Sequence, residues 1–129
     1  MREPVSDRDE MVAQMAPLLD DQAYCFLFIS PEMAPTALGS AIGTFREDEG
    51  VTAIVPEGVA RELGDESSAF ARITLRVHSA LAGVGLTAAV SGALADAEIA
   101  CHMVAGFHHD HVFVTAQRDA EAPYNLKNL

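Results

Sequence analysis

The chain has 129 residues, of which half are hydrophobic and 21% are charged, a balance typical of one folded globular body and too short for a large multidomain enzyme. Nineteen acidic against eight basic side chains give a formal net charge of −11, and such a surface repels phosphate backbones and anionic lipids. Nucleic acid and membranes are therefore excluded as expected partners, which leaves small molecules and proteins.

The first residues contain no apolar signal-peptide core, and no apolar run approaches the roughly 20 residues of a membrane span. We therefore expect a soluble, cytoplasmic protein. Cys25 and Cys101 each lie in an apolar run, where a free thiol behaves as a small buried hydrophobic group. No disulfide is expected between them.

The first half of the chain predicts a helix, a strand, a hairpin and a second helix. Ser6 and Asp9 have the spacing of a capping box, so a helix is expected from near Asp7, and its apolar spacing is kept by Met11, Val12, Met15, Leu18 and Leu19 until Pro17 stops or distorts it. Residues 23–30 are typical of a buried strand, and residues 31–40 of a loop or a single helical turn. A hairpin is predicted over 41–55 around Gly50, and a short helix over 56–63 that ends at Gly64.

The second half begins with a strand over 70–78, whose apolar side chains alternate with polar ones. A helix is predicted over 86–97 from the spacing of its apolar residues, which are Leu86, Ala89, Val90, Ala93, Leu94 and Ala97. Two strands within 99–107 and 111–116 then form a hairpin that turns at 108–110. A last helix is expected to begin only near position 122, because Pro123 lies in this stretch.

From residue 70 onward the order is strand, helix, strand, strand and helix, which is most of a βαββαβ ferredoxin-like unit. The first half has the same order if residues 31–40 form a reduced helix. We therefore predict an α+β fold with two tandem degenerate units, residues 1–66 with the N-terminal helix and residues 67–129. A half of about 60 residues buries little surface alone, so the units are expected to pack as one antiparallel-sheet α/β sandwich.

Residues 77–106, VHSALAGVGLTAAVSGALADAEIACHMVAG, resemble the ACT domain, a small ferredoxin-like regulatory module of amino-acid metabolism. Residues 77–85 correspond to its first strand and glycine-containing turn, and residues 90–99 to its first helix and the exit from it. Over residues 24–116 the chain also looks like a family of short bacterial proteins with two tandem ACT-like units. The resemblance implies an amino-acid ligand and a homodimer, without catalysis or a cofactor.

The resemblance places the ligand at the turn between the first strand and the first helix, with one residue of the next strand: His78, Ser79, Gly83, Val84, Gly85, Leu86, Thr87 and His102. The residue types favour the same turn, because glycines admit a ligand close to the backbone and the free amides of a helix start attract a carboxylate. The chain departs from the family at His78, where an acidic or amide residue is usual, and at Glu98, where glycine is common.

A second candidate site is formed by His108, His109, Asp110 and His111, which are ligand types that zinc prefers. Successive strand residues point to opposite faces, so a polar hairpin turn is the favoured interpretation. The wet face of the 70–78 strand carries Arg72, Thr74 and Arg76, which could pair with acidic groups across a subunit interface or face water.

No nucleophile motif, zinc-protease motif, phosphate loop or dinucleotide fingerprint is present in the sequence. We therefore expect a regulatory protein that binds an amino acid and is not an enzyme. The alternatives are an oligomerisation or interaction module without a ligand and, less favoured, a small metal-dependent enzyme that uses the cluster at 108–111.

Overall fold

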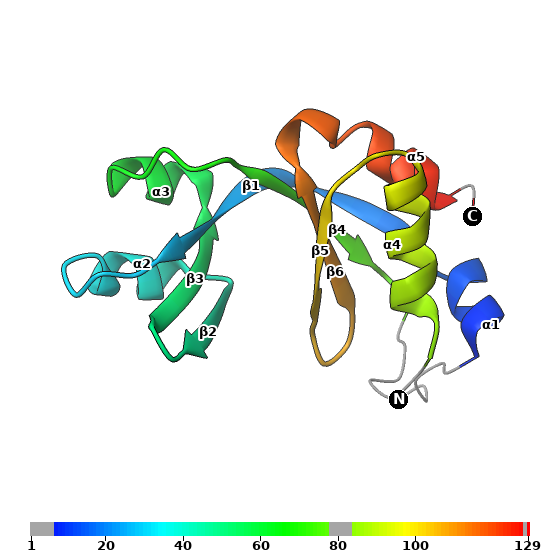
Figure 1. The fold of residues 1–129 in the computed structure, drawn as a ribbon, viewed down its shortest axis with the longest axis horizontal. Helices are drawn as coiled ribbons and strands as arrows, with labels where there is room; N and C mark the ends of the chain where they lie inside the picture. Colours follow the sequence, from blue (N-terminus) through cyan, green and yellow to red (C-terminus); the bar gives the residue numbers. More distant parts are fainter. Residues whose placement is uncertain (1–6, 78–83, 128) are drawn as a thin grey trace. The chain divides into compact units, whose positions relative to one another are not determined.

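The computed structural model describes residues 7–77, 84–127 and 129 (Figure 1). Its helices are α1 (Arg8–Ala13), α2 (Ala34–Ser40), α3 (Glu57–Glu62), α4 (Leu86–Asp96) and α5 (Glu121–Lys127), with a 3₁₀ turn η1 (Ala116–Arg118). Its strands are β1 (Pro17–Phe28), β2 (Gly43–Glu47), β3 (Gly50–Pro56), β4 (Phe70–Leu75), β5 (Cys101–Ala105) and β6 (Asp110–Thr115). Within these residues, no helix has the length and apolar character needed to cross a membrane.

The chain divides into two compact units, which we call the middle unit (residues 21–70) and the terminal unit (residues 1–20 and 71–129). Strand, helix, strand, strand and helix follow one another as β1-α2-β2-β3-α3 and again as β4-α4-β5-β6-α5. The predicted α+β ferredoxin-like fold is confirmed. The segment 31–40, expected to be a loop or a single turn, contains the helix α2.

Hydrogen bonds join the strands in the order β2-β3-β1-β4-β6-β5, and the β1–β3, β2–β3 and β5–β6 pairs are antiparallel. The first four residues of β1 belong to the terminal unit. There the Arg76 N–H donates to the Met15 carbonyl at 2.8 Å, and the Arg72 guanidinium pairs with Asp20 at 2.7 Å. In the terminal unit the start of β1 therefore takes the place of the last strand of a βαββαβ unit.

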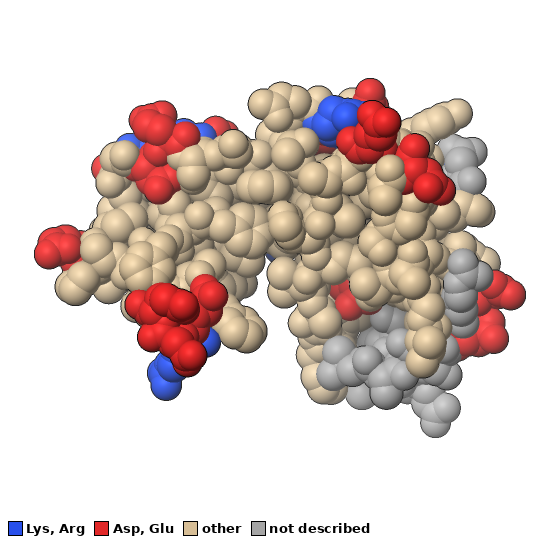
Figure 2. Space-filling view, in the orientation of Figure 1, with Lys and Arg blue, Asp and Glu red and all other residues tan. Residues whose placement is uncertain are grey.

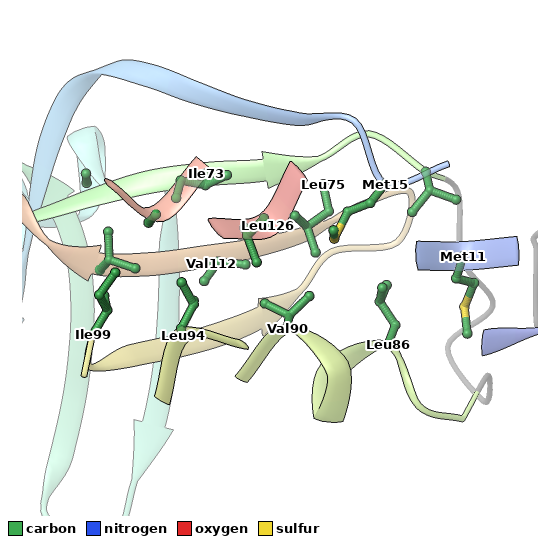
Figure 3. Close-up of a cluster of buried hydrophobic side chains, with 14 residues drawn as sticks. Met11, Met15, Ile73, Leu75, Leu86, Val90, Leu94, Ile99, Val112 and Leu126 are labelled. Atoms are coloured by element: carbon green, nitrogen blue, oxygen red, sulfur yellow. The ribbon is translucent and has the colours of Figure 1, made fainter. Parts of the chain in front are cut away.

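The terminal unit has its core between the sheet and the helices α1, α4 and α5. The predicted alternation of β4 holds, because Ile73 and Leu75 are fully buried while Arg72 and Thr74 are half-buried on the other face. Figure 3 shows Leu86, Val90 and Leu94 of α4 directed toward these strands. The apolar stripe predicted for this helix is the surface that covers the sheet.

The middle unit has a smaller core. Cys25 and Leu27 of β1 pack with Ala53 and Val55 of β3 beneath α2 and α3. The hairpin from β2 to β3 turns where predicted, and Gly50 has a φ of 146°. A Cβ atom at this glycine would also lie 2.8 Å from the Phe28 ring, so both the backbone conformation and the nearby ring favour glycine here.

The first helix and the first strand differ from the prediction. Helix α1 ends at Ala13, and β1 begins at Pro17, six residues before the expected strand. Leu18 and Leu19 are therefore strand residues, and proline is tolerated because it is the first residue of the strand. The helix cap is Asp7, whose Oδ1 accepts the Glu10 N–H at 2.9 Å, whereas Ser6 lies outside the described residues.

The predicted division into residues 1–66 and 67–129 stays a prediction about the sequence repeat. The compact units differ from it in where the N-terminal helix packs. Met11 and Met15 are 0% and 2% exposed within the core of the terminal unit, beside Leu75 and Leu86. Helix α1 therefore packs with the second half of the chain, although it precedes the first.

Candidate functional site

The candidate site begins at the N-terminus of α4. Gly85 is the N-cap residue and has a φ of 105°, a left-handed conformation that glycine adopts without strain. Its carbonyl accepts the Ala89 N–H at 2.9 Å, which starts the helix. The first turn contains no acidic residue, and no described side chain caps it. Its amide groups and the helix dipole therefore favour an anion at this end.

The residues predicted to line this turn have different accessibilities. Val84 is 80% exposed, and Thr87 on the first turn of α4 is also exposed. Leu86 is 3% exposed and its side chain points into the core (Figure 3), so it can offer a ligand only its backbone N–H. His78, Ser79 and Gly83 lie outside the described residues.

His102 was predicted to join this site, and the structure does not bring it there. It lies on β5 opposite Phe113 of β6, while its neighbours Cys101 and Met103 pack against the core that α4 covers. Because side chains alternate along a strand, His102 faces away from α4. Strand β5 also starts beside the C-terminus of α4, since the Ile99 N–H donates to the Leu94 carbonyl at 2.8 Å (Figure 1).

The exit from α4 contains a residue in a conformation that favours glycine. Glu98 has a φ of 58°, and its N–H donates to the Ala95 carbonyl at 2.9 Å. With the bond from Ile99 to Leu94, this is the Schellman pattern of a helix end. The glycine expected here from the ACT resemblance is thus replaced by glutamate without loss of the turn.

Arg118 of η1 also stabilises this helix end, and the sequence pattern gave no signal for it. Its guanidinium donates to the Ala97 carbonyl at 3.2 Å and to the Glu98 carbonyl at 3.3 Å, and it pairs with Glu121. A cation beside the last carbonyls of a helix is favoured by the helix dipole.

The histidine-rich turn has a geometry that separates its rings. The loop spans residues 106–109, where the Gly106 N–H donates to the His109 carbonyl at 2.9 Å, and Asp110 already belongs to β6. The centroids of the His108 and His109 rings are 6.4 Å apart and tilted by 50°. His109 Nδ1 is buried and has no hydrogen-bond partner within the described chain. Among the described residues, no three His, Cys, Asp or Glu side chains form a group that could hold a metal ion.

His111 lies apart from this loop, on the sheet face that Thr74 shares. Its Nδ1 is 3.1 Å from the Thr74 hydroxyl. Burial lowers the pKa of His111, and the positive charge of Arg72 and the neighbouring His109 lower it further, against the opposite effect of Asp110. The folded state therefore favours the neutral form of this histidine.

Acidic side chains are spread over the visible surface, as Figure 2 shows, with few basic ones among them. The acidic run at 47–49 forms part of the exposed hairpin between β2 and β3. The absence of acidic residues from the first turn of α4 is thus a local feature of a strongly negative chain.

A family model of the ACT domain matches residues 4–72, just over half of the chain. The match lies on the first half, whereas the resemblance in the sequence was carried by residues 77–106. No curated protein matches the chain.

Solved structures show the same fold. A Vibrio cholerae protein of unknown function, described as a possible transport protein, is 36% identical, with 92% of each chain covered and a TM-score of 0.80. The regulatory subunit of aspartate kinase from Thermus thermophilus is 12% identical, with 90% of this chain and 97% of that chain covered and a TM-score of 0.65. A structure of aspartokinase alpha and beta subunits is 16% identical, with 87% of this chain and 95% of that chain covered and a TM-score of 0.60.

Proposed function

Because this chain belongs to the ACT domain family, we propose that it is a regulatory protein that binds an amino acid at the turn before α4. It acts in the cytoplasm as a homodimer, by binding and without catalysis or a cofactor. The observation that carries the proposal is the N-terminus of α4, where Gly85 is left-handed and no described side chain caps the first turn.

The ligand carboxylate meets the backbone N–H groups of the first turn of α4. Glycine at position 85 lets the carboxylate approach the backbone, and the helix dipole adds a favourable interaction. The exposed Thr87 hydroxyl donates a further hydrogen bond, and the exposed Val84 side chain contacts the apolar part of the ligand. His102 has no part in this site, because it faces away from α4.

Regulation follows if the ligand binds one arrangement of the protein more tightly than another. The ligand can shift pairing between two copies, or with a partner enzyme, only by the difference in its affinity for the two arrangements. Fold likeness to an aspartate kinase regulatory subunit agrees with such a role and does not identify the ligand.

An interaction module without a ligand is the second candidate, and an exposed aromatic row favours it. Phe45 of β2 and Phe28 of β1 both lie opposite Thr52 of β3, so the three side chains share one face of the sheet. These two phenylalanines are 72% and 60% exposed. Exposed aromatic clusters of this kind mark surfaces for protein partners.

Thermal denaturation with each of the twenty amino acids tests the proposal. A ligand at a hundred times its dissociation constant adds about 2.7 kcal/mol to the stability, so one or a few amino acids should raise the Tm measurably. Thr87→Val should lower the affinity for that amino acid by roughly tenfold, which is the equivalent of one lost hydrogen bond to a charged group. The matched control is Thr44→Val, at an exposed position of β2 in the middle unit.

If no amino acid raises the Tm, the binding proposal is wrong and the interaction module is favoured. Light scattering then tests the interaction module, because Phe45→Ser should reduce the assembled mass of such a module. A ligand response of equal size in Thr87→Val and in the wild-type chain would place the amino acid elsewhere.

A further inference from the structure

A pocket of about 540 Å³ opens in the terminal unit among α1, the segment that follows it, α4 and α5. This volume lies in the range of small-molecule sites, roughly 300–1,000 Å³. The pocket is separate from the turn before α4, because α4 contributes Ala89 and none of Val84 to Thr87. It is lined entirely by described residues.

The inner wall of the pocket is apolar. Met15 and Leu126 are 2% and 1% exposed, and Val12 and Ala89 extend the wall along α1 and α4. An aliphatic chain placed against these side chains would leave water without forcing a polar group to lose hydrogen bonds.

The rim of the pocket is charged, with two cations and one carboxylate. Arg76 and Lys127 are two of the eight basic residues of a chain with a net charge of −11, and Lys127 is its sole lysine. Asp9 supplies the carboxylate. Unlike the surface as a whole, the rim therefore favours an anion.

Arg76 is held in place at this rim. Its backbone N–H donates to the Met15 carbonyl and its Nε to the Ala16 carbonyl, each at 2.8 Å. Ala16 has a φ of 42°, a conformation rare for residues other than glycine, and its carbonyl is the one that anchors the guanidinium. A fixed guanidinium presents its remaining N–H groups in the planar geometry that matches a carboxylate.

We propose that this pocket binds a small aliphatic carboxylate, with its chain against Val12, Met15 and Leu126 and its carboxylate at Arg76 and Lys127. The apolar wall selects the chain, and the two cations select the charged end. The apolar wall accepts no hydrogen bonds from an ammonium group, so a free amino acid could enter the pocket only with its ammonium group at Asp9 on the rim. This site is additional to the turn before α4 and does not depend on it.

Titration of ¹⁵N-labelled protein with butanoate, hexanoate and octanoate tests the proposal. Affinity should rise about fourfold for each added methylene that enters the pocket. Amide shifts should concentrate on Val12, Ala89 and Leu126. Octan-1-ol and octylammonium are the matched probes, and each should bind at least about tenfold more weakly than octanoate because the charge-assisted hydrogen bonds are missing.

Three variants localise the binding. Arg76→Gln should weaken octanoate about tenfold, and Lys127→Gln about two- to threefold, since an exposed point charge contributes less. Ala13→Leu, at an exposed pocket residue at the end of α1, should fill the space and weaken octanoate more than butanoate. The control for charge is Arg46→Gln, at an exposed position of β2.

Equal affinity of octanoate and octan-1-ol, or equal loss in Arg76→Gln and Arg46→Gln, would overturn the proposal. So would shifts centred on Phe45 and Thr52, because they would indicate detergent-like binding to the aromatic row. If Arg76→Gln lowers the Tm, Lys127→Gln and Ala13→Leu still decide the question. Thr87→Val should leave octanoate binding unchanged, which separates this site from the proposed amino-acid site.

Discussion

His111 shows how the burial of one side chain links stability to pH. Its Nδ1 lies 3.1 Å from the Thr74 hydroxyl. Burial of the ring disfavours its charged form, and Arg72 opposes a positive charge from the same sheet face. The folded state therefore prefers the neutral imidazole.

We predict that stability falls as the pH drops below about 6.5, the pKa of an unfolded histidine. Because the pKa of His111 is lowered by folding, the unfolded chain binds more protons in this range, and stability declines until the folded pKa is passed. The contribution cannot exceed about 1.4 kcal/mol per pH unit for one group. Urea denaturation between pH 7.5 and pH 5 measures it.

His111→Gln should remove this part of the pH dependence while keeping a polar partner for Thr74. The control is His108→Gln, whose ring is exposed at the hairpin turn. A pH dependence that persists in His111→Gln and vanishes in His108→Gln would contradict the assignment.

Among the elements, helix α4 is flanked at both ends by a residue in the left-handed conformation, but only one of the two is glycine. Gly85 occupies the left-handed position at the start, and Glu98 occupies the left-handed position after the end. For residues other than glycine this conformation costs roughly 1 kcal/mol. The Schellman bonds and the Arg118 contacts hold Glu98 there.

We predict that Glu98→Gly stabilises the protein by about 0.5–1 kcal/mol. Glycine relieves this strain, but part of the gain is offset because a glycine loses more conformational entropy on folding. Urea denaturation measures the change. Glu98→Gln is the matched control, since it removes the negative charge from the C-terminus of the helix and keeps the strained backbone. A gain of equal size in Glu98→Gln would assign the effect to charge.

The elements that could be predicted from the sequence are those in which the spacing of apolar residues fits either a strand or a helix, but not both. Alternation identifies β4, and a stripe from Leu86 to Leu94 identifies α4. The boundary between α1 and β1 could not be predicted, because Met15, Leu18 and Leu19 continue the helical spacing of Met11. The strand register there is set by the bond from Arg76 to Met15, which is a contact between distant parts of the sequence.

The candidate site was predictable in part for the same reason. The turn with Gly85 precedes a clear helix, so its place in the fold followed from local pattern. His102 was predicted to join this turn, whereas its apolar neighbours Cys101 and Met103 pack against the core and place it on the other face of β5. The pocket at Arg76 could not be found, since its walls come from four separate stretches of the chain.

For the whole molecule, the division into units decides what the N-terminal helix stabilises. Met11 is fully buried with residues of β4, α4 and α5, and none of the middle-unit core residues belongs to that cluster. The terminal unit therefore needs both ends of the chain to complete its core. The sequence repeat, by contrast, assigns this helix to residues 1–66.

We predict that Met11→Ala lowers the free energy of unfolding by about 2–5 kcal/mol, because it leaves a cavity in the terminal-unit core. Native-state hydrogen exchange at low denaturant should show the largest loss of protection in β4, α4 and β6. Val55→Ala, in the core of the middle unit, is the matched control and should affect β1 and β3 near Cys25 first. If Met11→Ala instead exposes residues 21–66 and leaves α4 protected, the helix belongs with the first half of the chain, as the sequence repeat predicts.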